Sequence, residues 1–167
     1  GAALIMSTSG TTGLPKCAVI STAGLLANIL DIQRYFSPDS RDRICICRPL
    51  YHCAVLTGEF LFSLANGVDI YFHEGDFEPR GLLRELHARH ITALCATPTL
   101  LHCLCKTAQR KGAPLTLRHI AASGECMTRA TAALLCETLP NARIYHVYGL
   151  TEAGPRVSYL PPALFEE

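Results

Sequence analysis

The sequence predicts an α/β domain in which helices cover both faces of a mostly parallel sheet. Short apolar segments alternate with longer segments in which leucine and isoleucine recur every three or four residues. The first pattern is typical of buried strands and the second of amphipathic helices. Strands separated by helices of about a dozen residues indicate βαβ crossovers, which join parallel strands. At 167 residues, the chain has the length of a single domain with one core.

Each predicted strand is short and apolar, and each predicted helix ends near a helix-breaking sequence. Ser37-Pro38 follows the first helix, Asn66-Gly67 follows the second, and Thr128 provides an N-cap for the last. The strands are expected at residues 2–6, 44–47, 68–72, 91–96, 117–122 and 143–148. The helices are expected at residues 23–36, 54–66, 79–90, 98–110 and 128–139.

Charge and hydrophobicity exclude some classes of function. Fifteen basic and fourteen acidic residues leave a formal charge of +1, so no nucleic-acid partner is expected. No apolar run approaches the roughly 20 residues of a membrane helix, and no signal peptide is visible, so we expect a cytoplasmic protein without a membrane span. The chain opens directly in strand-like sequence, which suggests a piece of a longer chain. A charged fraction of only 17% indicates apolar surface that another part covers.

Nine cysteines raise the question of a metal site or of disulfides. Most lie in apolar segments, such as Cys45 and Cys47 in RICICRPL and Cys95 in ITALCATP, where cysteine behaves as a small hydrophobic residue. The close pairs are spaced C-x-C, whereas zinc sites favour C-x-x-C. We therefore expect buried thiols in a reducing cytosol rather than a metal cluster.

The stretch STSGTTGLPK, residues 7–16, follows the first predicted strand, and ligands of open α/β sheets bind at such loops. Gly10 and Gly13 allow successive backbone amides to turn toward one centre, hydroxyls add donors, and Lys16 adds a positive charge. That composition suits a phosphate chain. It is not a Walker A loop, because Pro15 precedes the lysine where glycine is required. A flexible linker is the alternative on composition alone.

Two later loops add weaker signals. In VYGLTEAG, residues 147–154, Tyr148 offers a face on which a base can stack, and Glu152 offers a carboxylate for Mg²⁺. ASGEC, residues 122–126, combines a glycine turn with an acid at a strand end. Taken singly, such residues more often serve the turn or the helix start than a ligand.

Together the motifs resemble those of the adenylate-forming superfamily, which includes acyl-CoA synthetases, aryl-CoA ligases, firefly-type luciferases and adenylation domains. The matches run from Thr8 to Lys16 and from Tyr148 to Glu152. PLYHC, at 49–53, stands where family members carry an aromatic or histidine segment beside the acyl pocket, and ASGEC stands along the adenine. The resemblance covers essentially the whole chain, which is then a single α/β domain, a central part of the large AMP-binding domain.

The resemblance implies that ATP and Mg²⁺ convert a carboxylic acid into an acyl-adenylate with release of pyrophosphate. The acyl group would then pass to the thiol of coenzyme A or of a carrier protein's phosphopantetheine. Glu152 would bind the metal, and His52, Thr151 and Glu152 would serve catalysis, although His52 has a packing role as its alternative. The residues implied to bind the nucleotide are Thr8, Ser9, Gly10, Thr11, Thr12, Gly13, Lys16, Ser123, Gly124, Glu125, Tyr148, Gly149 and Thr151.

The resemblance also has implications for the acid substrate and for the activity of residues 1–167 alone. Amino-acid-activating members place an aspartate near the loop that corresponds to 49–53, where this chain has no acid, so a fatty, acyl or aryl acid is favoured. The ribose-binding aspartate and the C-terminal domain with a catalytic lysine do not occur within 1–167. This stretch alone is therefore expected to be inactive and to work with the remaining parts of a longer chain. A non-catalytic nucleotide-binding or scaffolding paralogue and a kinase-like NTPase are the alternatives.

Overall fold

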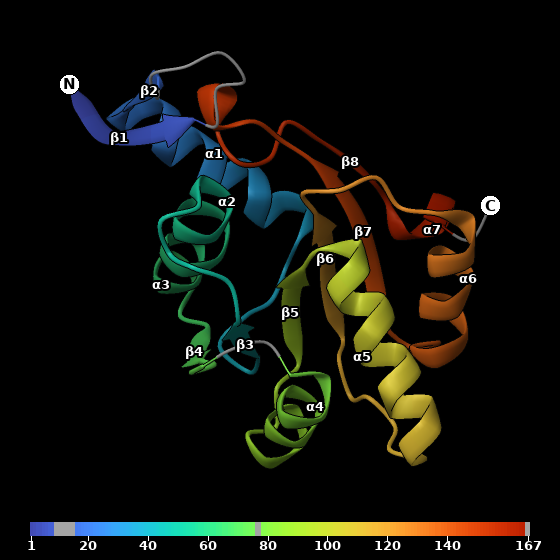
Figure 1. Ribbon diagram of the computed structural model, residues 1–167. Coiled ribbons are helices and arrows are strands. Elements are labelled where there is room, and N and C mark those ends of the chain that lie inside the picture. Colours follow the sequence, from blue (N-terminus) through green and yellow to red (C-terminus); the bar gives the residue numbers. More distant parts are fainter. Residues whose placement is uncertain (9–15, 76–77, 166–167) are drawn as a thin grey trace.

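A six-stranded sheet forms the centre of the protein (Figure 1). The computed structural model describes residues 1–8, 16–75 and 78–165. The strand order is β4-β3-β5-β6-β7-β8; the first five strands are parallel, and β8 is antiparallel to β7. The strands are β3 (Arg43–Ile46), β4 (Asp69–Phe72), β5 (Ala93–Ala96), β6 (His119–Ser123), β7 (Arg143–Tyr148) and β8 (Ser158–Leu160).

Helices cover both faces of this sheet, as the sequence predicts. Successive side chains of β5 point to opposite faces of the sheet, so Leu94 packs with the helices of one face and Cys95 with those of the other. The core therefore consists of two layers, one on each face of the sheet. The first face carries α4 (Pro79–Ala88), α5 (Pro98–Lys111), α6 (Arg129–Thr138) and α7 (Pro162–Phe165), and the second carries α1 (Thr22–Tyr35) and α3 (Phe62–Asn66).

The helix ends follow from local chemistry. Thr97 and Thr128 are N-caps whose hydroxyls accept from the backbone amides of Leu100 and Thr131, at 3.3 and 3.2 Å. Gly112 ends α5 in the left-handed conformation, with a φ of 59°. The expected N-cap at Thr128 is therefore confirmed.

The first strand departs from the expected strand–loop–helix arrangement. β1 (Ala2–Thr8) pairs antiparallel with β2 (Lys16–Ser21) in a separate two-stranded sheet, so STSGTTGLPK connects two strands rather than a strand and a helix. Met6 and Ile20 supply the buried side of this pair and pack with Cys53. The alternation in residues 16–21 is that of a half-buried strand, and this short strand was missed because its apolar residues lead directly into the helical pattern that follows.

The helix expected at residues 54–66 is interrupted. It comprises α2 (Cys53–Val55), a π-helix, η1 (Leu56–Leu61), and α3. The wider π turn places three consecutive residues of η1 in the interior: Thr57, Gly58 and Glu59. A regular amphipathic α-helix buries residues that are three or four positions apart, not three neighbours. The burial of Thr57, Gly58 and Glu59 therefore reflects the departure from α-helical geometry.

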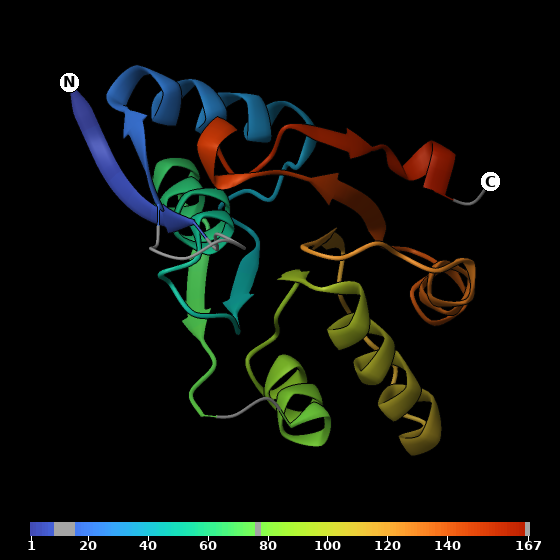
Figure 2. The same ribbon diagram turned by 45° about the horizontal axis from the view of Figure 1, so that its top comes forward.

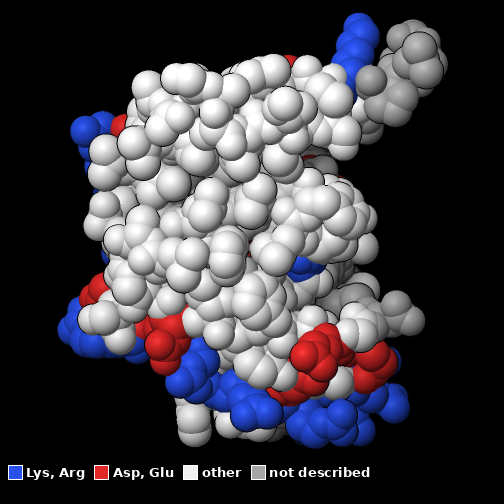
Figure 3. All heavy atoms as spheres, turned by 90° about the vertical axis from the view of Figure 1, so that its left-hand side faces the viewer, with Lys and Arg blue, Asp and Glu red and all other residues white. Residues whose placement is uncertain are grey.

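One side of the molecule carries few charges. Figure 3 shows the centre of the face that bears β1, α2 and α3 as almost free of charged side chains, which lie instead along the bottom and left of the view. Large apolar side chains are exposed on these and the adjoining elements, among them Ile5, Val19, Leu26, Leu30 and Leu64. This exposed apolar surface agrees with the low charged fraction of the sequence.

Candidate functional site

The carboxyl ends of the parallel strands define the rim on which the predicted loops lie. From β3 the chain moves to β4 on one side, and from β4 it crosses back over β3 to form β5 on the other side. The connections that follow β3 and β5 therefore run in opposite directions along the sheet. Such a switch point is where open α/β sheets bind ligands. The structure brings the loops after β3, β5, β6 and β7 to this rim: residues 48–53, 97–99, 123–127 and 149–154.

A cavity of about 500 Å³ lies between the loops after β6 and β7. Three of the four residues predicted beside adenine, Gly124, Glu125 and Tyr148, line it together with Gly149, whereas the fourth, Ser123, does not. The Tyr148 side chain is 60% exposed, so its ring face is open to a ligand. The other lining residues are Cys126, His146, Val147, Ser158, Tyr159 and Leu160.

Gly149 is required by a close approach of two chain segments. A Cβ atom at this position would lie 1.8 Å from the carbonyl oxygen of Pro155 and 3.1 Å from the backbone nitrogen of Arg156. The segment returning toward β8 therefore passes directly against the backbone of Gly149, and the Val157 amide donates to the Tyr148 carbonyl at 2.8 Å. These contacts close the base of the loop that carries Thr151.

The Ser123–Glu125 loop is tied to its neighbours by side chains. The Glu125 carboxylate accepts from the hydroxyl and the amide of Thr99, at 2.6 and 3.2 Å. The Ser123 hydroxyl accepts from Nη1 of Arg48 at 3.5 Å. Glu125 therefore lines the cavity while its carboxylate holds the start of α5. Gly124 takes a φ of 95°, which favours glycine.

The turn that carries Glu152 lies beside the β1–β2 pair. A cavity of about 220 Å³ is lined by residues 152–155 on one side and by Val19, Ile20 and Asn28 on the other. In Figures 1 and 2, the short 3-10 helix η2 (Thr151–Ala153) lies next to β2 in both views. The turn of the second motif therefore lies beside the strand that begins at Lys16, the last residue of the first motif.

The ends of the first motif are also adjacent. Thr8 is opposite Lys16 in the strand pair, and its hydroxyl donates to the Lys16 carbonyl at 3.3 Å. Lys16 is exposed. The other predicted phosphate-binding residues, Ser9, Gly10, Thr11, Thr12 and Gly13, lie outside the described residues.

His52 lies at the start of α2, on the rim. Its side chain is exposed, does not cap the helix, and packs against the ring of Tyr51 with the ring centroids 4.5 Å apart. Burial raises the pKa of the Cys53 thiol; a hydrogen bond with Thr57 opposes this shift and the negative charge of Glu152 adds to it. Thr151 is half-buried and Glu152 is exposed.

Three charged residues near the rim were not selected from the sequence: Arg48, Glu59 and Arg156. Arg48 and Glu59 form an ion pair of 2.6 Å in which the Glu59 side chain is fully buried. Burial raises the pKa of the Glu59 carboxyl, and the Arg48 guanidinium opposes that shift. The available signal was a glutamate within the apolar run LTGEFLF, because unpaired acids are rare in such a run.

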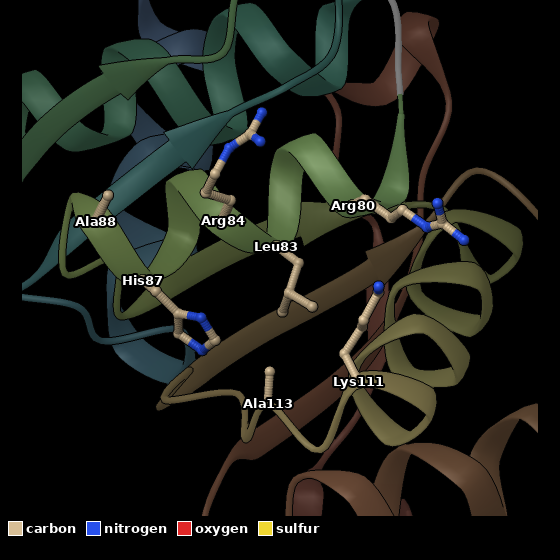
Figure 4. A pocket seen from close by; sticks show the side chains of 7 residues that line it. All are labelled: Arg80, Leu83, Arg84, His87, Ala88, Lys111 and Ala113. Carbon is tan, nitrogen blue, oxygen red and sulfur yellow. The ribbon is translucent and has the colours of Figure 1, made fainter.

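A further cavity, of about 690 Å³, lies away from the rim (Figure 4). Its wall consists of α4 residues together with Lys111 and Ala113 at the far end of α5, and Leu83 and His87 face it. None of the predicted site residues lines this cavity. Because α5 starts at the rim and runs back along the sheet, this cavity lies toward the amino ends of the strands.

The fold and the loops gathered at the rim are those of an open α/β domain, and comparison with known proteins gives its family. The family model of AMP-binding enzymes matches residues 1–166. The chain belongs to this family. The part that the structure describes contains no helix long and apolar enough to cross a membrane.

Similar proteins are acyl-CoA ligases of several kinds. Acyl-CoA synthetase ALT10 of Alternaria alternata is 34% identical over 158 residues, which are 93% of this chain and 27% of that protein. Acyl-CoA ligase cnsG of Penicillium expansum is 28% identical over 160 residues, 95% of this chain and 33% of that protein. The 4-chlorobenzoate–CoA ligase of a Pseudomonas species is 31% identical over 159 residues, 91% of this chain and 29% of that protein.

Solved structures confirm the fold. The AMP complex of O-succinylbenzoate coenzyme A synthetase from Bacillus subtilis matches 98% of this chain and 33% of its own, with a TM-score of 0.85 and 24% identity. VinN in complex with L-aspartate matches 98% of this chain and 41% of its own, with a TM-score of 0.84 and 25% identity. The chain thus spans about a third of the length of the relatives it matches.

Proposed function

We propose that residues 1–167 are the central part of the large domain of an ATP-dependent acid–thiol ligase. The whole protein would activate a fatty, acyl or aryl acid as an acyl-adenylate with release of pyrophosphate. It would then transfer the acyl group to the thiol of coenzyme A or of a carrier protein's phosphopantetheine. Family membership supports this chemistry, and the names of the ligases at 28 to 34% identity support an acyl or aryl acid.

The observation that supports the proposal is that the second motif lies beside the strand that follows the first. Residues 152–155 share a cavity with β2, while Tyr148 and Gly149 share a second cavity with Gly124 and Glu125. A nucleotide with adenine in the second cavity and its phosphates toward Lys16 would cross the switch point of the sheet, where such ligands bind. Adenylation depends mainly on positioning and on charge stabilisation, which this arrangement supplies.

Each predicted residue has a role in this proposal. Tyr148 would stack on adenine, and the backbone of Gly124 and Gly149 would let the base approach closely. Thr151 would contact the α-phosphate, and Lys16 would neutralise the β- and γ-phosphates together with the loop from Thr8 to Gly13. His52 would orient the acid at the neighbouring edge of the rim. Ser123 and Glu125 would set the shape of the adenine cavity.

The residues at the turn fit a magnesium ion. Glu152 is exposed and takes part in none of the ion pairs within residues 1–8, 16–75 and 78–165, so its carboxylate is available as an oxygen ligand. Magnesium would supply charge neutralisation for the phosphates and for the leaving pyrophosphate. In this chain, Glu152 would hold the ion and the Thr151 hydroxyl would bind the phosphate beside it.

The surroundings of the protein belong to the same proposal. The exposed apolar face with Leu26, Leu30 and Leu64 would contact the remaining parts of the longer chain, which would carry the catalytic lysine. We expect the protein to act in the cytoplasm, in fatty-acid or related acyl metabolism. The acceptor of the acyl group would be coenzyme A or a carrier protein.

The test is pyrophosphate release by the whole protein across a panel of fatty, aryl and amino acids. We expect release that depends on one of the fatty or aryl acids, and its loss in Lys16→Ala and Glu152→Ala. Arg34→Ala is the matched control, because this residue is an exposed charge on α1 that forms a local ion pair with Asp31. Residues 1–167 alone are expected to be inactive.

The results also separate the alternatives. Nucleotide binding without acid-dependent release from any member of the panel would favour the non-catalytic paralogue. Hydrolysis of ATP that does not depend on an acid would favour a kinase-like NTPase. Release that survives in both Lys16→Ala and Glu152→Ala would contradict the assigned site.

A further inference from the structure

One buried carboxylate and two partly buried arginines form one cluster beneath the rim. Nη2 of Arg48 lies 2.6 Å from Oε1 of Glu59, and their side chains are 14% and 0% exposed. Nη2 of Arg156 donates to the carbonyl of Gly58, the neighbour of Glu59, at 3.0 Å and lies 3.2 Å from Sγ of Cys95. The cluster therefore contains two guanidinium groups and one carboxylate around the π-helix.

The members come from separate loops of the proposed site. Arg48 directly precedes the segment with His52, and its Nη1 also reaches the Ser123 hydroxyl at 3.5 Å. Arg156 directly follows the turn with Glu152. Glu59 joins the two through η1. A displacement of any one of these loops would have to move a buried charge.

The local sequence is fitted to these contacts. A Cβ atom on Gly58 would lie 3.1 Å from Nε of Arg156, which is tighter than an ordinary contact, so a side chain there would require the guanidinium to shift by a few tenths of an ångström. The Arg156 guanidinium also lies over the ring of Phe36, 4.8 Å from its centroid, and its carbonyl accepts from Nδ2 of Asn28 at 3.2 Å. Both ends of Arg156 are thereby fixed.

Burial of these charged groups costs free energy that apolar side chains would not cost. Nε of Arg48, Oε2 of Glu59 and Nη1 of Arg156 are buried and have no hydrogen-bond partner among the described residues. Buried ion pairs are frequently no more stabilising than apolar side chains of the same volume. What a charged pair adds is a defined geometry, because removal of one partner leaves the other charge buried and uncompensated.

We propose that Arg48, Glu59 and Arg156 are positioning residues that hold the His52 segment, the Ser123 loop and the Glu152 turn in one fixed arrangement. They are buried below the rim and touch no reacting atom, so they act through the loops they anchor. The expected effect of the cluster on the catalytic rate rests on the proposed function. The expected effect on the loops does not.

The experiment uses the whole protein and replaces the charges without leaving a cavity. Arg48→Met/Glu59→Leu substitutes apolar side chains for the ion pair, and Glu59→Gln removes the charge while it retains the shape. Asp31→Leu/Arg34→Met is the matched control, because this ion pair also measures 2.6 Å but its side chains are 62% and 79% exposed. The measurements are Tm, hydrogen exchange of residues 123–126 and 149–154, and kcat and KM for ATP in pyrophosphate exchange.

We expect the double variant to fold with a lowered Tm, because the Arg156 charge is left without the Glu59 carboxylate. We also expect exchange in the two loops to accelerate about tenfold and kcat to fall about 100-fold, with a smaller change in KM. The control should change none of these. A folded double variant with unchanged loop exchange and unchanged kcat would overturn the inference. If that variant does not fold, Glu59→Gln decides by the same readouts.

The two proposals fail in different ways. An inactive parent protein would overturn the ligase, and loop exchange in the variants would still judge the cluster. An active parent whose variants lose only Tm, with normal loop exchange and normal kcat below the transition, would mean that the cluster serves packing alone.

Discussion

Replacement of Gly149 by alanine tests the close approach that shapes the rim. The added Cβ would lie 1.8 Å from the Pro155 carbonyl oxygen, whereas ordinary contacts begin at 3.4 Å, so the two segments must separate by 3.4 − 1.8 = 1.6 Å. That shift is large enough to break the 2.8 Å bond from the Val157 amide to the Tyr148 carbonyl. Overpacking costs about 1–3 kcal/mol and a lost hydrogen bond about 1 kcal/mol, so we expect a loss of about 3 kcal/mol.

A calorimetric scan measures this loss directly. For a domain of this size, about 3 kcal/mol corresponds to a fall in Tm of about 10 °C. Gly67→Ala is the control, because Gly67 has a φ of 65° but a Cβ added there would meet nothing within 4 Å, and only backbone strain of about 1–2 kcal/mol is expected. If Gly149→Ala were no more destabilising than Gly67→Ala, the steric argument would be refuted.

Three further predictions concern stability and reactivity. Thr128→Ala removes the N-cap of α6 and should lower Tm by about 3 °C in the same scan. Burial alone would raise the pKa of Asp42, but hydrogen bonds, among them one from Thr92, lower it below its ordinary value. The stability that this lowered pKa contributes is present above the unfolded pKa of about 4 and is lost as the pH falls through the folded pKa. In an acid titration followed by unfolding, Asp42→Asn should therefore lack this pH-dependent loss of stability. Burial raises the pKa of the Cys95 thiol to about 11, whereas Cys17 is exposed. A thiol reagent should therefore label Cys17 before Cys95, as measured by mass spectrometry. Equal labelling of the two cysteines in the native protein would contradict the burial of Cys95.

Sequence periodicity predicted the central sheet well because each strand there is a local, apolar segment. Residues 143–148 were expected as a strand and form β7 with the same bounds, and the remaining parallel strands lie within a few residues of their expected places. Parallel strands buried on both faces need little information from elsewhere in the chain to be recognised. The same holds for α5 and α6, whose threonine caps are visible in the sequence.

The elements that were missed depend on distant partners. β2 is a strand because it pairs with β1, and β8 is three exposed residues that pair with the end of β7. The π-helix is stabilised by Arg156, which lies 98 residues from Gly58 in the chain, so no local pattern predicts it. The motifs identified the rim residues by resemblance, but the anchoring role of Glu125 toward Thr99 required coordinates.

The contacts at the rim are made by the protein itself, and this has a consequence for the proposed reaction. Glu125 bonds to Thr99, Gly149 packs on Pro155, and Arg48 reaches Ser123. Loops that are already fixed lose little conformational entropy when a nucleotide binds, so more of the interaction energy remains for affinity and for stabilising developing charge. In the proposed reaction, fixed loops would also keep the distance between the acid and the α-phosphate constant, which favours attack. The buried charges beneath the rim and the glycines within it therefore serve the same end, since both reduce the freedom of the loops before substrate arrives.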